Sequence, residues 1–291
     1  MQIISGSNSI EFSKELSKKM NWELSIPNYK IFNDGESYLR LSKPPTEEII
    51  IIQSLYYPQD THLMQLYNLI STAKRLGSKN ITVYTPYFSY ARSDKEILQY
   101  EAISARTVLH ILEMLGVNHL ITLDIHNPQI FKFAKTMKIT NIYPIKSVSN
   151  YFKTHLSNLK NILIVSPDQG AIQRAEMLAN EMGLKFTSLE KTRHPITGNV
   201  QVTTKHTKVS SETVIIVDDI ISTGTSLAQA SSLLRIMGVS TIHYFITHFL
   251  SSEALDALKE ISDGIIISTH SVPGIVNQIS TIDDLCEVLS R

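Results

Sequence analysis

The chain has 291 residues, of which 43% are hydrophobic, and this length suits two domains of ordinary size, each with its own core. Its 27 basic and 27 acidic side chains give a formal net charge of zero, so no overall field favours nucleic acid or an anionic membrane as a partner. A single cysteine, Cys286, excludes an internal disulfide. With no signal sequence and no apolar run near the ~20 residues of a membrane span, we expect a cytoplasmic protein.

The first half of the chain alternates apolar, β-branched runs with helical patterns. Strands are predicted at residues 3–4, 49–52, 81–84 and 120–123, and helices over about 9–20, 61–76 and 102–115. Such repeated strand–helix units are typical of a largely parallel sheet with helices on both faces.

The second half repeats this scheme. A helix is predicted over about 148–159, and strands near 162–165, at Phe186, and at 214–217, 242–245 and 265–267. The proline after Ile142 and Tyr143 marks a boundary. The sequence therefore predicts two tandem α/β domains, residues 1–143 and 144–291, with a last helix able to pack back on the first domain.

Three of the apolar runs end in acidic or histidine-bearing turns. They lead into Asp124 and His126, into Asp168, and into the pair Asp218 and Asp219. Ligands of open parallel sheets collect beyond the carboxyl ends of the strands. We therefore predict that these turns contribute to one shared site.

The segment 214–226 combines a buried strand, two carboxylates, and a loop of hydroxyl residues and glycine before a helix. The loop comprises Ser222, Thr223, Gly224, Thr225 and Ser226, and Gly238 is the expected helix stop. Backbone N–H groups at a helix N-terminus can bind a phosphate, and the carboxylates can accept hydrogen bonds from a diol. Ribose 5-phosphate carries both groups. The alternative is an ordinary turn in which Asp219 bonds backbone and Ser222 or Thr223 caps the helix.

This segment resembles the phosphoribosyl-diphosphate (PRPP) motif that type I phosphoribosyltransferases share with PRPP synthetases, the ribose-phosphate pyrophosphokinases. It does not separate the two groups. Residues Phe32, Asp34, Gly35 and Glu36 resemble the Phe-x-Asp-Gly-Glu loop with which the synthetases reach ATP. An Asn-Asp-Gly sequence is otherwise simply a turn.

The segment 86–95 resembles the synthetase signature Pro-Tyr-x-x-Tyr-Ala-Arg-Gln-Asp. The resemblance implies that Arg92 contacts the nucleotide, together with Ser93, which stands where the family has glutamine. The alternative is that the aromatic residues pack over the core while Arg92 is solvated.

Two of the acidic turns also match the family. The sequence 123–129 resembles an Asp-Leu-His segment, which implies that His126 reaches the catalytic Mg²⁺, and 166–171 resembles Ser-Pro-Asp-x-Gly, which implies a metal or ribose contact for Asp168. A structural histidine and a helix-capping aspartate are the alternatives.

The segment 189–199 is basic and rich in turn residues, and we expect a loop between two strands. It resembles the flexible catalytic loop of the family, which implies that Lys191 and Arg193 act on the transferring group and that Arg193 also contacts ribose 5-phosphate. One residue apart on an extended backbone, the two side chains point the same way. A solvated loop is the alternative.

The matches occur in order from Ile3 to Pro273, and the chain resembles a PRPP synthetase of the compact, archaeal-like form. The resemblance implies two phosphoribosyltransferase-like domains, a homo-oligomer, and transfer of a diphosphoryl group from ATP, with Mg²⁺, to the C1 hydroxyl of ribose 5-phosphate. Two alternatives remain: a type I phosphoribosyltransferase that consumes PRPP, and a non-catalytic, nucleotide-binding regulatory homologue.

Overall fold

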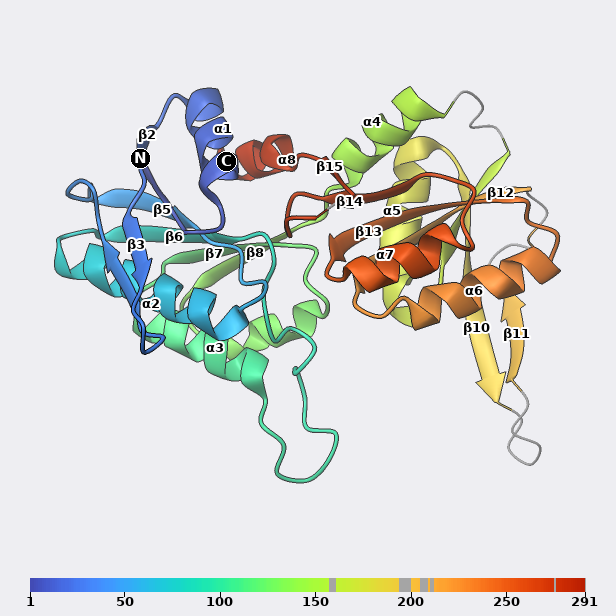
Figure 1. Ribbon diagram of the computed structural model, residues 1–291, viewed down its shortest axis with the longest axis horizontal. Helices are drawn as coiled ribbons and strands as arrows, with labels where there is room; N and C mark the ends of the chain where they lie inside the picture. The colour runs from blue at the N-terminus through green and yellow to red at the C-terminus, as the bar shows by residue number, and fades with distance from the viewer. Residues whose placement is uncertain (157–160, 194–199, 205–208, 210–211, 275, 291) are drawn as a thin grey trace. The chain divides into compact units, whose positions relative to one another are not determined.

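The computed structural model describes residues 1–156, 161–193, 200–204, 209, 212–274 and 276–290. The chain forms two compact units (Figure 1). Unit 1 comprises Met1–Ile142 with Leu285–Arg291, and unit 2 comprises Tyr143–Asp284. Each unit is an α/β structure built on a mainly parallel sheet, which confirms the predicted fold class.

The sheet of unit 1 has six strands, all parallel, in the order β2-β1-β5-β6-β7-β8. The strands are β1 (Gln2–Ser5), β2 (Glu23–Ser25), β5 (Glu48–Ile52), β6 (Asn80–Thr85), β7 (His119–Leu123) and β8 (Lys138–Ile142). Its central strands are apolar on successive positions because both faces of the sheet are covered. Ile49 to Ile52, for example, are fully buried.

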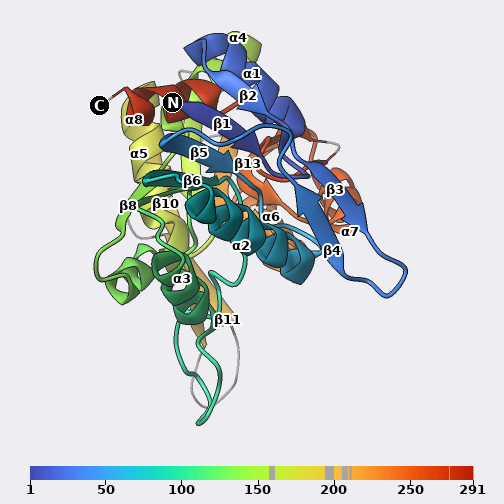
Figure 2. The ribbon, with the colours of Figure 1, turned by 90° about the vertical axis from the view of Figure 1, so that its left-hand side faces the viewer.

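Helices cover the two faces of this sheet (Figures 1 and 2). Helix α1 (Ile10–Met20) packs on one face, where the ring of Phe12 lies 5.5 Å from that of Tyr84. Helices α2 (Gln59–Arg75) and α3 (Ser104–Met114) cover the other face, and their buried leucines share a core with alternate residues of β5, β6 and β7. A 3-10 segment, η1 (Pro128–Phe133), follows β7.

A small antiparallel hairpin leaves the sheet between β2 and β5. It consists of β3 (Asn28–Ile31) and β4 (Ser37–Arg40) and lies beside α2 (Figure 2). The Tyr29 hydroxyl donates to the carbonyl of Ser5 at 2.7 Å, and Leu39 packs on the core under α2. The base of the hairpin is therefore fixed to the carboxyl end of β1.

The sheet of unit 2 has the order β11-β10-β9-β12-β13-β14-β15, with only β10 and β11 antiparallel among these strands. The strands are β9 (Ile162–Ser166), β10 (Lys185–Arg193), β11 (Val200–Thr204), β12 (Thr213–Ile221), β13 (Thr241–Phe249), β14 (Ile266–Thr269) and β15 (Asn277–Ile279). The short segment η2 (Gln169–Ala171) follows β9, and α8 (Ile282–Leu289) follows β15.

Two cores lie on opposite faces of this sheet. Helices α4 (Ile145–His155) and α5 (Ile172–Met182) pack against one set of strand residues, among them Ile164 and Ile215. Helices α6 (Thr225–Ile236) and α7 (Ser252–Lys259) pack against the alternate set, among them Val165 and Ile216. The alternation follows from the two-residue period of side chains along a strand.

The two sheets share one topology. In each unit the chain first adds strands on one side of its first strand, β1 or β9, and then crosses over to add the remaining strands on the other side. The order of strand addition therefore reverses between β1 and β5 in unit 1 and between β9 and β12 in unit 2. Such a reversal opens a crevice beyond the carboxyl ends of the two strands, where ligands bind in open α/β sheets. In unit 2 this point lies between the Asp168 turn and Asp218–Asp219.

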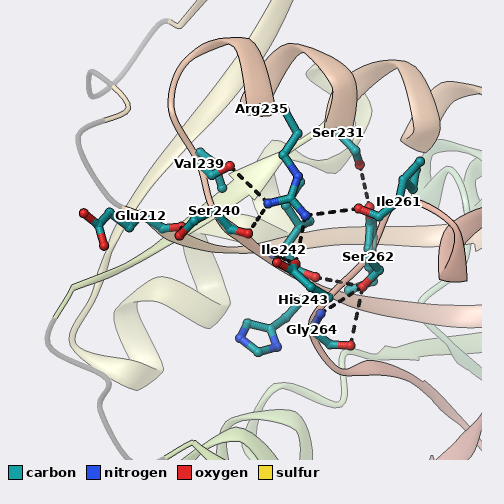
Figure 3. Close-up of polar contacts among 12 residues, drawn as sticks. Glu212, Ser231, Arg235, Val239, Ser240, Ile242, His243, Ile261, Ser262 and Gly264 are labelled. Atoms are coloured by element: carbon teal, nitrogen blue, oxygen red, sulfur yellow. Dashed lines mark hydrogen bonds and ion pairs between the residues drawn. The ribbon is translucent and has the colours of Figure 1, made fainter.

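Arg235, on the last turn of α6, lies at the end of that helix farthest from the Asp218–Asp219 edge (Figure 3). Its guanidinium donates to the carbonyls of Val239 at 3.1 Å, Ile261 at 3.2 Å and Ser240, and lies 2.8 Å from an oxygen of Asp263. These bonds hold the carboxyl end of α6 to the start of β13. The amino end of α6 is therefore held at the ligand edge of the sheet.

Several element boundaries differ from those predicted. The helix predicted from residue 102 begins at Ser104, because the Ala102 carbonyl accepts a hydrogen bond from the Ser93 hydroxyl. The helix predicted from residue 148 begins at Ile145, directly after Pro144, whose ring suits a helix start. Strands β2, β3, β8, β11 and β15 were missed, since they are short and rich in polar residues.

Acid should weaken the fold through His119. Its Nε2 lies 2.8 Å from Thr140 Oγ1, and burial, with the nearby Lys138 charge, lowers the pKa of His119 to about 4. The unfolded chain protonates this ring near pH ~6.5, so its contribution to stability is complete above that pH and is lost as pH falls toward 4. We expect about 1–2 kcal/mol of loss, after allowance for partial solvent screening.

Urea unfolding from pH 7.5 to 4.5 measures this loss. His119→Gln should flatten the pH dependence, whereas the same change at the exposed His270 should leave it unchanged. Parallel curves for wild type and His119→Gln would contradict the assignment.

Candidate functional site

Strand β12 carries the two carboxylates of the candidate sugar site. The prediction that the strand ends at Val217 is wrong, because Asp218 still pairs with Ile246 and Ile220 with His248. The strand continues to Ile221. Asp219 is buried whereas Asp218 is partly exposed, and the two carboxyl groups interact directly with one another.

A buried arginine connects this strand to the preceding acidic turn. The Nη2 of Arg174, on α5, lies 3.7 Å from Asp219 Oδ2, and both side chains are 6% exposed. Its Nη1 donates to the carbonyl of Gly170 at 2.9 Å. Arg174 therefore bridges the two strand ends that flank the switch point of unit 2. Sequence reasoning did not assign this role, although an arginine between Ala171 and Ala175 on the inner helix face was the available signal.

Asp168 begins the turn after β9. Its Oδ1 accepts the N–H of Gly170 at 2.8 Å, and its side chain is exposed. The Ser166 hydroxyl donates to the Asp168 carbonyl. The capping role that we held as an alternative is therefore observed. The carboxylate remains accessible for a ligand at the same edge.

The electrostatics of this edge favour groups that donate hydrogen bonds. Asp218 is only partly exposed, and this partial burial, the Asp219 carboxylate and the Asp168 charge together raise its pKa well above the usual value. The Asp219 N–H, which donates to Asp218 Oδ1 at 2.9 Å, acts in the opposite direction. Three carboxyl groups at one sheet edge attract a cation or sugar hydroxyls. An anionic group belongs elsewhere in the site.

The loop that follows β12 offers a place for an anion. Gly224 has φ of 78° and occupies the N-cap position of the 12-residue helix α6. A glycine has no side chain that could accept hydrogen bonds from the first-turn N–H groups of the helix, so these groups have no side-chain cap. The alternative in which Ser222 or Thr223 caps the helix is therefore wrong. Those N–H groups and the helix dipole favour a phosphate. Ser222, Thr223, Thr225 and Ser226 are exposed around them.

Gly224 is required on backbone grounds. Its positive φ lies in the left-handed region that side chains disfavour. Space is not the constraint, because a Cβ there would lie 3.6 Å from Ala254 of α7, an ordinary van der Waals distance. Helix α6 then runs to Ile236, and Gly238 follows with φ of 92°. This confirms the predicted stop.

Lys191 and Arg193 occupy a strand and not the loop that we predicted. Both lie in β10, where Lys191 pairs with Val202 and Arg193 with Val200 of β11. Antiparallel pairing extends the strand beyond the parallel part of the sheet, which a basic, polar sequence did not reveal. The connecting residues 194–199, including His194, lie outside the described residues.

In unit 1 the β3–β4 turn presents the four predicted nucleotide residues. The N–H groups of Phe32 and Gly35 donate to the carbonyls of Glu36 and Phe32, each at 2.9 Å, and Gly35 has φ of 94°. Asp34 Oδ1 accepts the Glu36 N–H at 3.1 Å. The ring of Phe32 is 40% exposed and lies edge-on to Tyr38 at 5.9 Å. The turn thus offers an aromatic surface and carboxylates to solvent.

The segment after β6 combines packing and exposure. Tyr87 and Phe88 are buried, which agrees with the alternative that the aromatic residues of this segment pack over the core. Arg92 is exposed. The Ser93 hydroxyl donates to the Ala102 carbonyl at 3.0 Å and accepts the Ser104 N–H at 3.3 Å. Ser93 thereby closes the base of the long loop before α3, and its contact with ATP remains a prediction.

The β7 turn carries the predicted metal histidine. Asp124 is buried with φ of 41°, and its N–H donates to the Ile142 carbonyl at 2.7 Å, whereas His126 is exposed. The described residues contain no group of three or more His, Cys, Asp or Glu side chains placed to hold a metal ion. Mg²⁺ commonly retains water and takes one or two protein ligands together with substrate phosphates, and such an ion needs no larger cluster.

Comparison with known proteins defines the class of this chain. Residues 1–116 match the N-terminal domain of ribose phosphate pyrophosphokinase, and residues 140–279 match the phosphoribosyl transferase domain. The fold of unit 2 is thus that of a phosphoribosyltransferase-type domain.

Full-length relatives narrow the class. The chain is 34% identical to a ribose-phosphate pyrophosphokinase of Saccharolobus solfataricus, over 97% of each chain, and 35% identical to one of Pyrococcus abyssi, over 96% of this chain and 94% of the relative. A crystal structure of phosphoribosylpyrophosphate synthetase from Mycobacterium smegmatis superposes with a TM-score of 0.88 at 26% identity, covering 99% of this chain and 97% of the other. The chain belongs to the ribose-phosphate pyrophosphokinase family.

Removal of the Arg174 charge should destabilise the fold. Arg174→Met leaves Asp219 buried without the guanidinium beside it, and breaking a buried ion pair costs about 3–5 kcal/mol. Asp219→Asn in the same chain removes the remaining charge and should recover part of that loss. Urea unfolding of the three proteins provides the test, and equal stability of wild type and Arg174→Met would show that the 3.7 Å contact contributes nothing.

Proposed function

We propose that this chain is a ribose-phosphate diphosphokinase, which transfers the β,γ-diphosphoryl group of ATP to the C1 hydroxyl of ribose 5-phosphate and yields PRPP and AMP. The observation that carries the proposal is the edge of unit 2, where Asp218 and Asp219 adjoin the uncapped start of α6 at the switch point. Family membership over the full chain supports the same reaction.

Ribose 5-phosphate fits this edge in one orientation. Its phosphate would bind the N–H groups of the loop Ser222–Ser226, because a helix N-terminus favours an anion. Its 2- and 3-hydroxyls would donate to Asp218 and Asp219. The phosphate cannot bind at these carboxylates, because like charges repel. In the proposal Arg193 adds a contact to this substrate, and C1 faces away from the loop.

The triphosphate donor would bind the exposed residues of unit 1. Phe32 offers a surface for the adenine ring, and Asp34, Gly35 and Glu36 form the same turn. Arg92 supplies a positive charge for the phosphates, and Ser93 adjoins it. Two separate substrate sites suit a reaction whose barrier is lowered mainly by positioning and charge neutralisation.

In the reaction the C1 oxygen of ribose 5-phosphate attacks the β-phosphorus of ATP. The bond between that phosphorus and the oxygen that bridges to the α-phosphate breaks, AMP leaves with the electron pair, and the hydroxyl proton is released. Negative charge grows on the bridging oxygen as the bond breaks. We assign its stabilisation to Lys191 and Arg193, since cationic groups placed where charge develops lower the barrier most.

Mg²⁺ would supply charge neutralisation on the phosphates when bound. We propose two residues for binding this ion, each in its own unit: the accessible Asp168 carboxylate in unit 2 and the exposed His126 in unit 1. Oxygen donors suit this ion, and the imidazole suits a contact beside it or through its water. Asp168 also has a structural bond to Gly170 that fixes its orientation.

We further propose a cytoplasmic homo-oligomer, a dimer or larger. The family resemblance supports the assembly, and the single cysteine suits a reducing compartment. Within the described part of the chain, none of the helices has both the length and the apolar character that a membrane span requires.

One assay tests the reaction. Purified protein is mixed with ATP, Mg²⁺ and ribose 5-phosphate, and AMP and PRPP are quantified together. We expect both products in equal amounts. Absence of both would contradict the proposal in favour of a non-catalytic regulator, and consumption of added PRPP with a free base would favour a phosphoribosyltransferase.

Lys191→Ala should lower kcat by ~10²- to 10³-fold, the scale for losing one preorganised stabilising group. The affinity for ribose 5-phosphate should change far less, because the phosphate loop and the aspartates are untouched. Steady-state kinetics with calorimetric titration of ribose 5-phosphate separates the two quantities. Lys185→Ala, at the opposite end of the same strand, is the matched control, and an unchanged kcat in Lys191→Ala would exclude this lysine from the mechanism.

A further inference from the structure

Asn127 connects two candidate segments of unit 1 that are far apart in the sequence. Its Nδ2 donates to Asp94 Oδ2 at 2.5 Å, in a partly buried position. Asp94 follows Arg92 by two residues, and Asn127 follows His126 directly. One side-chain hydrogen bond thus joins the segment proposed for the nucleotide to the turn proposed for the metal.

The same asparagine is itself held in place. Its Oδ1 accepts the N–H of Gln129 at 3.0 Å and so caps the η1 segment. Both ends of the amide group are therefore used, and their assignment is fixed: a carboxylate can only accept, and a backbone N–H can only donate. This arrangement orients the amide donor toward Asp94.

The segment around Arg92 is anchored at three points. Tyr90, with φ of 62°, donates from its hydroxyl to Asp60 on α2 at 2.5 Å. The Ser93 hydroxyl bonds the Ala102 carbonyl. Asp94 bonds Asn127, and this third anchor is the one that reaches the carboxyl end of β7. Along the chain, Arg92 lies between the Tyr90 anchor and the anchors at Ser93 and Asp94.

We propose that Asn127 is a positioning residue for ATP use: through Asp94 it fixes the backbone that presents Arg92 relative to the β7 turn that presents His126. The inference rests on the proposed function. A hydrogen bond to a charged acceptor is among the stronger side-chain bonds, and small displacements of a positioning group reduce catalysis. Loss of this bond should weaken ATP use and spare ribose 5-phosphate, whose proposed site is in unit 2.

The sharpest test exchanges the two side chains. Asn127→Asp keeps an acceptor for the Gln129 N–H and sets a carboxylate against Asp94, so the KM for ATP should rise about tenfold or more. The KM for ribose 5-phosphate should remain within about twofold. Asp94→Asn alone retains an acceptor for Asn127 and should have a small effect. The double variant restores an amide–carboxylate bond with reversed polarity and should return the KM for ATP to within about threefold of wild type.

The controls separate positioning from folding and from the reaction itself. Asn150→Asp, an exposed position on α4, adds the same charge elsewhere and should leave both KM values unchanged. Thermal unfolding of every variant shows whether it is folded. A wild-type protein that makes no PRPP would contradict the proposed function, and with it the role of Asn127 in ATP use. With active wild type, an unaltered KM for ATP in Asn127→Asp, a double variant without rescue, or an equal rise of both KM values would overturn the proposal.

Discussion

The ligand edge of unit 2 depends on the contact between Arg174 and Asp219. Strands β9 and β12 are neighbours in the sheet, but the turn after β9 leads to η2 and the loop after β12 leads to α6. A contact between the two strand ends is what holds these segments together. The buried guanidinium provides it by reaching Asp219 on one side and the Gly170 carbonyl on the other. A buried charge is costly unless paired, so this arrangement fixes where the acidic edge faces. The uncapped start of α6 completes the site because Arg235 holds the far end of that helix.

The two units share strand order but differ at their switch points. In unit 2 the crevice between β9 and β12 adjoins exposed hydroxyl residues and a glycine N-cap. In unit 1 the corresponding position between β1 and β5 is occupied by its own polar groups: the Gly6 N–H donates to the Ile52 carbonyl at 2.7 Å, Asn8 donates to the Ser54 carbonyl at 2.7 Å, and Gln53 is fully buried. A Cβ on Gly6 would collide with Gln53. The exposed polar and aromatic side chains of unit 1 lie instead on the β3–β4 turn and on the loops after β6 and β7. This arrangement suits the proposal that unit 2 binds the sugar and unit 1 binds the nucleotide.

Much of the fold could be predicted because the apolar runs and helical periods report burial directly. The strands at Ile49 and Val214 and the stop at Gly238 are examples. Strands such as β8 and β11 could not be predicted, since their stability comes from pairing with a neighbour and not from their own composition. For the site, motifs predicted the Asp218 edge and the β3–β4 turn as candidate binding segments. The roles of Arg174 and Asn127 were missed because each depends on a partner that only the folded chain brings near: Asp219 is 45 residues from Arg174, and Asp94 is 33 residues from Asn127.

The central claim is that the loop at the start of α6 binds the phosphate of ribose 5-phosphate while Asp218 and Asp219 bind its hydroxyls. Hydrogen–deuterium exchange of the full chain, with ribose 5-phosphate and with ribose at the same concentration, tests this most directly. The account predicts that ribose 5-phosphate slows exchange in peptides covering residues 218–228 and that ribose, which lacks the phosphate, has little effect there. Equal protection by both sugars, or protection by ribose 5-phosphate confined to other peptides, would contradict it.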